Sequence, residues 1–62
     1  MSNQHIFVGK SRMEVEALCQ SSGIVYRITS VDGLPKIITM DYRPKRINLK
    51  IYNNLVVDVS YG

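Results

Sequence analysis

The chain has 62 residues, a formal net charge of +3, and 45% hydrophobic and 21% charged residues. A chain this short buries only about 60% of its unfolded surface when it folds, so we expect residues 1–62 to form a single domain with one modest core. The composition excludes intrinsic disorder and a membrane span, and the lone cysteine together with an amino terminus unlike a signal peptide predicts a cytoplasmic protein.

A helix that begins near Arg12 is the first element expected along the chain. Ser11 and Glu14 have the spacing of a capping box, in which the hydroxyl and the carboxylate accept hydrogen bonds from free backbone amides. Gly23 suits the carboxy-terminal cap and predicts that the helix ends after about three turns. An apolar stripe is expected to face the core, formed by Val15, Leu18 and Cys19.

Three strands are expected after the helix. Residues 24–30 are rich in β-branched and aromatic side chains, and Asp32-Gly33 breaks this first strand. Residues 47–52 and 55–60 alternate in polarity, and the Asn53-Asn54 turn between them predicts an antiparallel pair. The expected buried faces are Ile47, Leu49 and Ile51 in the second strand and Leu55, Val57 and Val59 in the third.

A long segment without a sustained period, Val31–Pro44, separates the first strand from the second. Connections of this length are uncommon in compact domains and are usually either functional or disordered. If the segment crosses between parallel strands, the helix packs on one sheet face and the loop projects away from it. The sequence therefore predicts an α+β fold, with one helix packed on a small three-stranded mixed sheet and a long exposed loop between strands one and two.

Residue types that support catalysis are sparse. His5 is the one histidine and has no cysteine or carboxylate at metal-ligand spacing, so we expect no metal site. The sequence has no glycine-rich phosphate loop, and no Ser-His-Asp set can be assembled from it. Cys19 lies on the buried stripe, where a free cysteine behaves as a small hydrophobe. We therefore expect a binding protein without a cofactor, and not an enzyme.

Half of the eight basic residues lie close together, namely Arg43, Lys45, Arg46 and Lys50. Such a cluster beside a loop can bind an anion, brace the loop through hydrogen bonds, or simply be solvated. The sequence leaves these three alternatives open.

The segment Ile38–Leu49 is the most distinctive part of the sequence, with the run Thr39-Met40-Asp41-Tyr42-Arg43 followed by Arg46. It resembles the reactive-site segment of the potato inhibitor I family of serine-protease inhibitors, the eglin type, and of the related small bacterial and fungal inhibitors. Phe7–Ser11 is similar to the approach to the helix in that family, and Gly62 is similar to its terminal glycine. The resemblance covers nearly the whole chain.

The resemblance implies an exposed loop that is offered to a serine protease like a substrate, in which Met40 fills the primary specificity pocket and Asp41 follows the scissile bond. Asn48 stands where the family commonly has a second arginine, and residues 30–36 form a longer segment than in the family. An exposed methionine suits the apolar pocket of a subtilisin-like or chymotrypsin-like enzyme. The implied reactive-site residues are Thr39, Met40, Asp41, Tyr42 and Arg43, supported from below by Arg46 and Asn48.

Three other interpretations stay open at this point. Met40 can turn inward and fill a gap in the core. The same scaffold can form a non-inhibitory oligomer that holds an anionic ligand, such as a nucleotide, at a subunit interface through Arg43, Lys45 and Arg46. It can also be a structural partner within a larger assembly.

Overall fold

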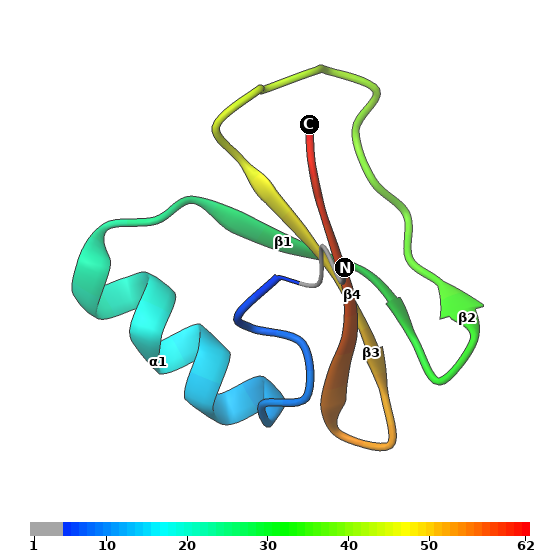
Figure 1. The fold of residues 1–62 in the computed structure, drawn as a ribbon. Coiled ribbons are helices and arrows are strands. Elements are labelled where there is room, and N and C mark those ends of the chain that lie inside the picture. The colour runs from blue at the N-terminus through cyan, green and yellow to red at the C-terminus, as the bar shows by residue number, and fades with distance from the viewer. Residues whose placement is uncertain (1–4) are drawn as a thin grey trace.

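The computed structural model describes residues 5–62, so the first four residues of the expected amino-terminal arm lie outside the described part of the chain. Figure 1 shows the helix on one side of the sheet and, at one end of the sheet, the long loop that rises from β2 and returns to β3. The elements are α1 (Arg12–Ser22), β1 (Tyr26–Val31), β2 (Leu34–Pro35), β3 (Ile47–Tyr52) and β4 (Leu55–Tyr61).

The sheet is mixed and has four strands in the order β2-β1-β3-β4. β1 lies parallel to β3, whereas the β1–β2 and β3–β4 pairs are antiparallel. The predicted α+β class is therefore confirmed, and the prediction of three strands is wrong. The connection between β1 and β3 is the crossover between parallel strands that the sequence analysis considered, and it contains both β2 and the long loop (Figure 1).

β2 is the strand that the sequence analysis missed. Asp32 and Gly33 have φ angles of 53° and 80°, which suit the two central positions of a tight hairpin turn. The break predicted at Asp32-Gly33 is thus a hairpin turn, and two residues of strand follow it, too few to show a period. Much of the extra length in residues 30–36 is therefore paired backbone, with Ser30 facing Pro35 and Val31 facing Leu34.

The boundaries of α1 agree with the sequence prediction. The Glu14 backbone N–H donates to Ser11 Oγ at 3.2 Å, which is the first half of the predicted capping box. The Glu14 carboxylate, which was expected to supply the second half, lies 3.6 Å from Lys10 Nζ instead. At the other end, Gly23 has a φ of 69° and donates its N–H to the Cys19 carbonyl. A left-handed glycine in this position ends the helix.

The core lies between α1 and the sheet. Leu18, which was expected in it, is 38% exposed, so that prediction is wrong. Val15 and Cys19 lie four residues apart in one row along the helix and are both buried, whereas Leu18 lies at the edge of this row. A single helix on so small a sheet buries only its central row. The buried apolar residues are Phe7, Val15, Cys19, Ile47, Leu49, Ile51 and Val56.

The burial of β3 was predicted correctly and that of β4 only in part. In β3 the three expected apolar residues are all buried. In β4 the expected Leu55 and Val57 are exposed and Val56 is buried instead, whereas the expected Val59 does pack against the core. The cause is a β-bulge, because one extra residue in a strand reverses which side chains face the core. Val57 has no partner in the ladder and lies between the pairs Lys50–Asp58 and Ile51–Val56.

Two further findings concern the described residues 5–62. None of their helices is long and apolar enough to cross a membrane. Cys19 is free and buried, and burial raises the pKa of its thiol, with the charge of Glu16 adding to this effect. The thiol therefore packs as a small hydrophobe, as the sequence analysis expected.

Candidate functional site

Residues 36–46, called the exposed loop below, connect β2 to β3. The segment predicted from the sequence, Val31–Pro44, begins too early because it includes β2. In Figure 1 the loop arches over the end of the chain at Gly62. The side chains of residues 36–45 are all exposed, and burial begins at Arg46. The loop therefore presents a continuous surface to solvent and meets the rest of the protein through a few defined contacts.

Met40 lies in the middle of this exposed surface. Its side chain is 96% exposed, so the alternative in which it turns inward and fills the core is wrong. Ile37, three residues earlier, is also fully exposed. The loop therefore offers large apolar side chains to a partner without any rearrangement of the core.

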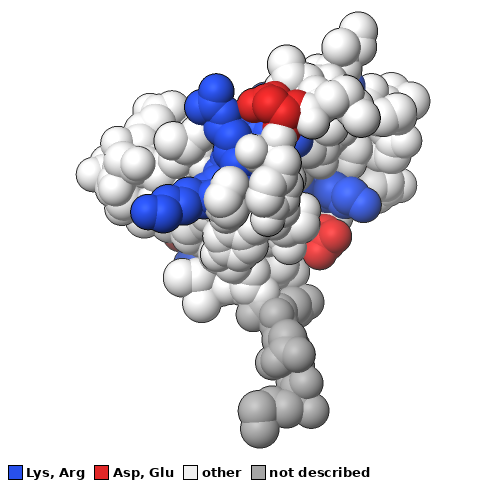
Figure 2. Space-filling view, turned by 90° about the horizontal axis from the view of Figure 1, so that it is seen from above, with Lys and Arg blue, Asp and Glu red and all other residues white. Residues whose placement is uncertain are grey.

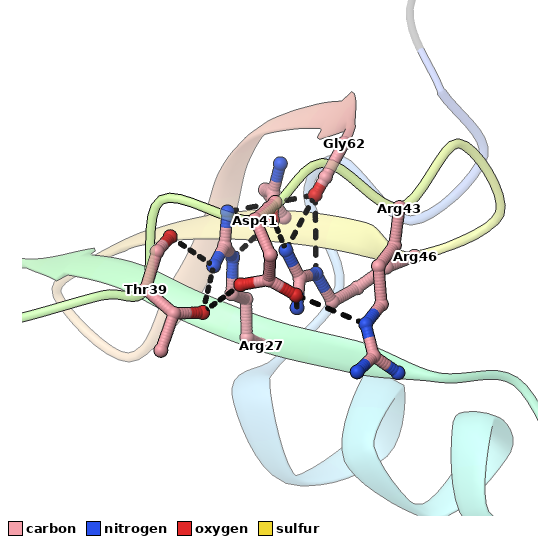
Figure 3. Close-up of polar contacts among 7 residues, drawn as sticks. Arg27, Thr39, Asp41, Arg43, Arg46 and Gly62 are labelled. Carbon is pink, nitrogen blue, oxygen red and sulfur yellow. Dashed lines mark hydrogen bonds and ion pairs between the residues drawn. The ribbon is translucent and has the colours of Figure 1, made fainter.

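Arg46 is the buried contact beneath the loop, with only 8% of its surface exposed. A turn at Pro44-Lys45 brings it back under the loop, closed by the Arg46 backbone N–H donating to the Arg43 carbonyl at 3.0 Å. Its guanidinium donates from Nη2 to the Asp41 carbonyl oxygen at 2.8 Å. Nε and Nη2 also donate to the Gly62 backbone oxygen, at 3.1 and 2.9 Å. The predicted support role of Arg46 thus corresponds to specific hydrogen bonds (Figure 3).

Arg27 of β1 is a second support, which the sequence analysis did not identify. Its Nη1 donates to the Thr39 carbonyl oxygen at 3.1 Å and lies 3.4 Å from Thr39 Oγ1. Its Nη2 lies 3.5 Å from the Gly62 oxygen (Figure 3). Asn48, the predicted support, acts one step away, because its Oδ1 accepts from Arg27 Nε at 2.7 Å. Asn48 was predicted to support the loop itself, whereas in the structure it orients Arg27, which bonds the loop.

A signal for Arg27 existed in the sequence only in combination with the strand register. Arg27 and Asn48 are direct partners in the parallel β1–β3 pair, and both lie between apolar neighbours in their strands. Two polar side chains side by side on the face opposite the core predict a contact across the strands. Arg27 and Arg46, together with their bonds to Thr39, Asp41 and Gly62, are called the arginine brace below.

Gly62 is the meeting point of the arginine brace. Its N–H donates to the Arg46 carbonyl at 3.0 Å, which extends the β3–β4 ladder by one bond. Its φ of 140° is unfavourable for residues with a side chain, and a Cβ there would lie 3.2 Å from Cε1 of Tyr42. Only glycine fits this position without movement of the Tyr42 ring, so Tyr42 closes the anchor point of the loop from outside.

Asp41 is surrounded by donors. The hydroxyl of Thr39 donates to Oδ1, while Arg43 Nε and Arg46 Nη1 lie 3.0 and 3.3 Å from Oδ2. The hydrogen bonds from Thr39 and Arg43, with the nearby charge of Arg46, hold the pKa of the Asp41 carboxyl well below its usual range. The carboxylate therefore stays ionised at neutral pH and ties the residues on either side of Met40 to one another.

The three residues of the anion-binding alternative are not equally available. Arg46 is buried and its donors end on Asp41 and Gly62, and Arg43 pairs with the carboxylate of Asp41. Lys45 is exposed. Seen from above, a few basic side chains gather on one side of the molecule with an acidic side chain next to them, and most of the visible face is uncharged (Figure 2). In residues 5–62 there is also no group of three or more His, Cys, Asp or Glu side chains that could hold a metal ion.

Chemically, the arrangement presents the Met40–Asp41 peptide bond to solvent while the carbonyl oxygens of Thr39 and Asp41 are fixed from below. Comparison with known proteins adds little to this geometry. No protein-family model matches the chain. A stretch of 36 residues, 58% of the chain, is 42% identical to part of uncharacterized protein R610 of Acanthamoeba polyphaga mimivirus. The matched part is 10% of the viral protein, so the chain spans only a small share of that relative.

Proposed function

We propose that the chain is an inhibitor of serine proteases, which presents the Met40–Asp41 peptide bond to its target like a substrate. The observation that supports this most is the pair of hydrogen bonds on either side of Met40. Arg27 bonds the Thr39 carbonyl at 3.1 Å and Arg46 bonds the Asp41 carbonyl at 2.8 Å. The side chain between these two fixed points is almost fully exposed.

Two physical consequences of these bonds favour inhibition over digestion. A loop that is already held in its bound shape loses little conformational entropy when it binds. If the protease cuts the bond after Met40, the arginine brace still holds both sides of the cut, through Thr39 on one side and Asp41 on the other. The new amine of Asp41 then stays beside the acyl group, so religation competes with release of the fragments.

The target class follows from the chemistry of Met40. An unbranched thioether side chain fills an apolar pocket and offers no charge to a pocket built for lysine or arginine. The proposed partners are therefore subtilisin-like or chymotrypsin-like enzymes, and trypsin-like enzymes are poor targets.

The test is residual activity of subtilisin and chymotrypsin over hours in the presence of the full chain, with the integrity of the loop followed by mass spectrometry. Met40→Gly removes the side chain that fills the specificity pocket. It should weaken inhibition by on the order of 2 to 4 kcal/mol, while the thermal midpoint changes little. Met13→Ala is the matched control, because Met13 is an exposed methionine on α1. This control should inhibit the proteases as strongly as the wild type does.

Two results would contradict the proposal. One is a wild-type chain that inhibits neither enzyme at micromolar concentration, and the other is a loop that is cut and released as fast as a flexible peptide. A stable oligomer whose thermal midpoint rises with added nucleotide would instead favour the anion-binding alternative.

A further inference from the structure

The sulfur-containing residues of the described part of the chain differ sharply in exposure to solvent. Met40 is 96% exposed and Met13 is 78% exposed, whereas Cys19 is completely buried. Met40 also stands apart from Met13 by its position, because it lies between the two residues that the arginine brace holds, Thr39 and Asp41. We propose that Met40 is a site of reversible oxidation by hydroperoxides, and that the sulfoxide formed there switches off protease binding by the exposed loop.

The reaction is a two-electron oxygen transfer that needs no group from the protein. A lone pair of the thioether sulfur attacks one oxygen of the peroxide, the S–O bond forms as the O–O bond breaks, and the other oxygen leaves as water after proton transfer when the oxidant is hydrogen peroxide. Sulfur is oxidised and the peroxide is reduced. A thiol-dependent sulfoxide reductase reverses the step, forming water and a disulfide.

The difference in exposure between Met40 and Cys19 directs the oxidant to the loop and away from the core. Peroxide reaches its sulfur without any movement of the fold, since the side chain is in solvent. Cys19 is shielded inside the core, and burial raises the pKa of its thiol, so little reactive thiolate is present. The protein can therefore take up oxygen at its loop while its core stays reduced.

The effect on binding rests on the proposed function. A sulfoxide adds a polar oxygen to the end of the side chain that enters the apolar pocket, and burial of a polar group without a hydrogen-bond partner is unfavourable. The arginine brace ends on the backbone and polar groups of Thr39, Asp41 and Gly62, so it is unaffected by the new oxygen. Oxidation should thus remove affinity and leave the fold and the loop shape unchanged.

The experiment treats the full chain with hydrogen peroxide, locates added oxygen by peptide mass spectrometry, and measures inhibition of subtilisin before and after treatment. Met13→Leu removes the other exposed methionine of the described residues and should behave like the wild type. Met40→Leu removes the sulfur, and each sample of this variant is compared with its own untreated form. We expect oxygen at Met40 and at least about a tenfold rise in the inhibition constant of wild type and Met13→Leu. Met40→Leu should be insensitive to peroxide, and a sulfoxide reductase should restore the treated wild type.

Retention of full inhibition by protein that bears oxygen at Met40 would overturn the inference, as would oxidation of Met13 or Cys19 ahead of Met40. A fall in the thermal midpoint that parallels the loss of inhibition would also overturn it, because the loss would then come from unfolding. Failure of the untreated protein to inhibit would contradict the proposed function and with it the switch. The mass spectra would still decide whether Met40 is the oxidation site.

Discussion

Two regions of this small protein, called the apolar end and the loop end below, are held by different forces. At the apolar end, which is the core between α1 and the sheet, Val15 and Leu49 are fully buried among apolar side chains, and the hydrophobic effect that holds them is non-directional and proportional to area. At the loop end, Arg46 is buried among polar partners and its bonds end on named atoms of Asp41 and Gly62. Apolar burial makes the protein fold, whereas directional bonds fix where one peptide bond lies. The two ends should therefore fail in different ways.

The largest expected effect is on the apolar end. Leu49→Ala removes the largest fully buried side chain and should lower the free energy of unfolding by roughly 3 kcal/mol, since it leaves a cavity in the core. Molecules that remain folded should inhibit with little change, because the arginine brace is untouched. Denaturant titration and inhibition assays at low temperature measure the two quantities. Val57→Ala, on the exposed bulge of β4, is the control and should change stability by less than about 0.5 kcal/mol. An equal loss of inhibition and stability in Leu49→Ala would show that the two ends are not separable.

The next effect in size tests the loop end. Arg46→Ala leaves the Asp41 carbonyl oxygen without its donor and takes two of three donors from the Gly62 oxygen. It should cost about 2 kcal/mol of stability. Its main consequence should be kinetic, because the freed loop is cut and released, and inhibition becomes temporary. Time courses of protease activity with mass spectrometry of the loop detect this change. Arg43→Ala is the matched control, since Arg43 is exposed and bonds only the Asp41 side chain in this site. Persistent inhibition by Arg46→Ala would show that the arginine brace is not needed to keep the cleaved loop in place.

A smaller effect is expected for the second support. Arg27→Ala removes the bond to the Thr39 carbonyl and should cost about 1 kcal/mol, because Arg27 is only partly buried. Asn48→Ala should act through the same arginine. A double-mutant cycle measured by thermal and denaturant unfolding, with cleavage rates alongside, tests this order of action. The double variant should be little worse than Arg27→Ala alone. Additive losses would mean that Asn48 supports the loop independently.

The smallest effect is expected from the titration of Asp41. The pKa of Asp41 is lower in the folded protein than the value of about 3.9 for an unperturbed aspartate, so its ionised form stabilises the native state. This contribution is present above about pH 4 and is lost as the pH falls through the folded-state pKa. The stability difference between wild type and Asp41→Asn should therefore shrink in acid. Parallel pH profiles for the two proteins would contradict the role given to the carboxylate. Leu49→Ala provides the contrast, since its loss contains no titrating group.

The sequence predicted the parts of this fold that depend on local pattern. The Ser11 cap and the alternation of Ile47, Leu49 and Ile51 depend on neighbours within a few residues, and the structure bears them out. The burial pattern of β4 was only partly correct because the bulge at Val57 depends on pairing with β3. Local propensity carries no information about such a register shift.

In the candidate site, too, contacts between residues close in sequence were predicted, and those that depend on strand pairing were not. Arg46 lies close in sequence to Asp41 and was predicted as a support, in agreement with its hydrogen bonds. Arg27 was missed because its contact with Thr39 joins residues from β1 and the exposed loop, brought together only by the crossover. Asn48 was predicted as a direct support of the loop, and its partner Arg27 could be named only once the parallel register was known.

The two loop bonds of the arginine brace that flank Met40 end on main-chain oxygens, those of Thr39 and Asp41. Every amino acid supplies such an oxygen, so residues 37, 38 and 40 can change identity without removing a donor or an acceptor of these bonds. Selection or design can therefore vary residues 37, 38 and 40 of the loop, whereas the donors Arg27 and Arg46 must stay constant. A scaffold of this kind can be redirected to a new partner by substitutions at its exposed tip, while the cost in stability stays low.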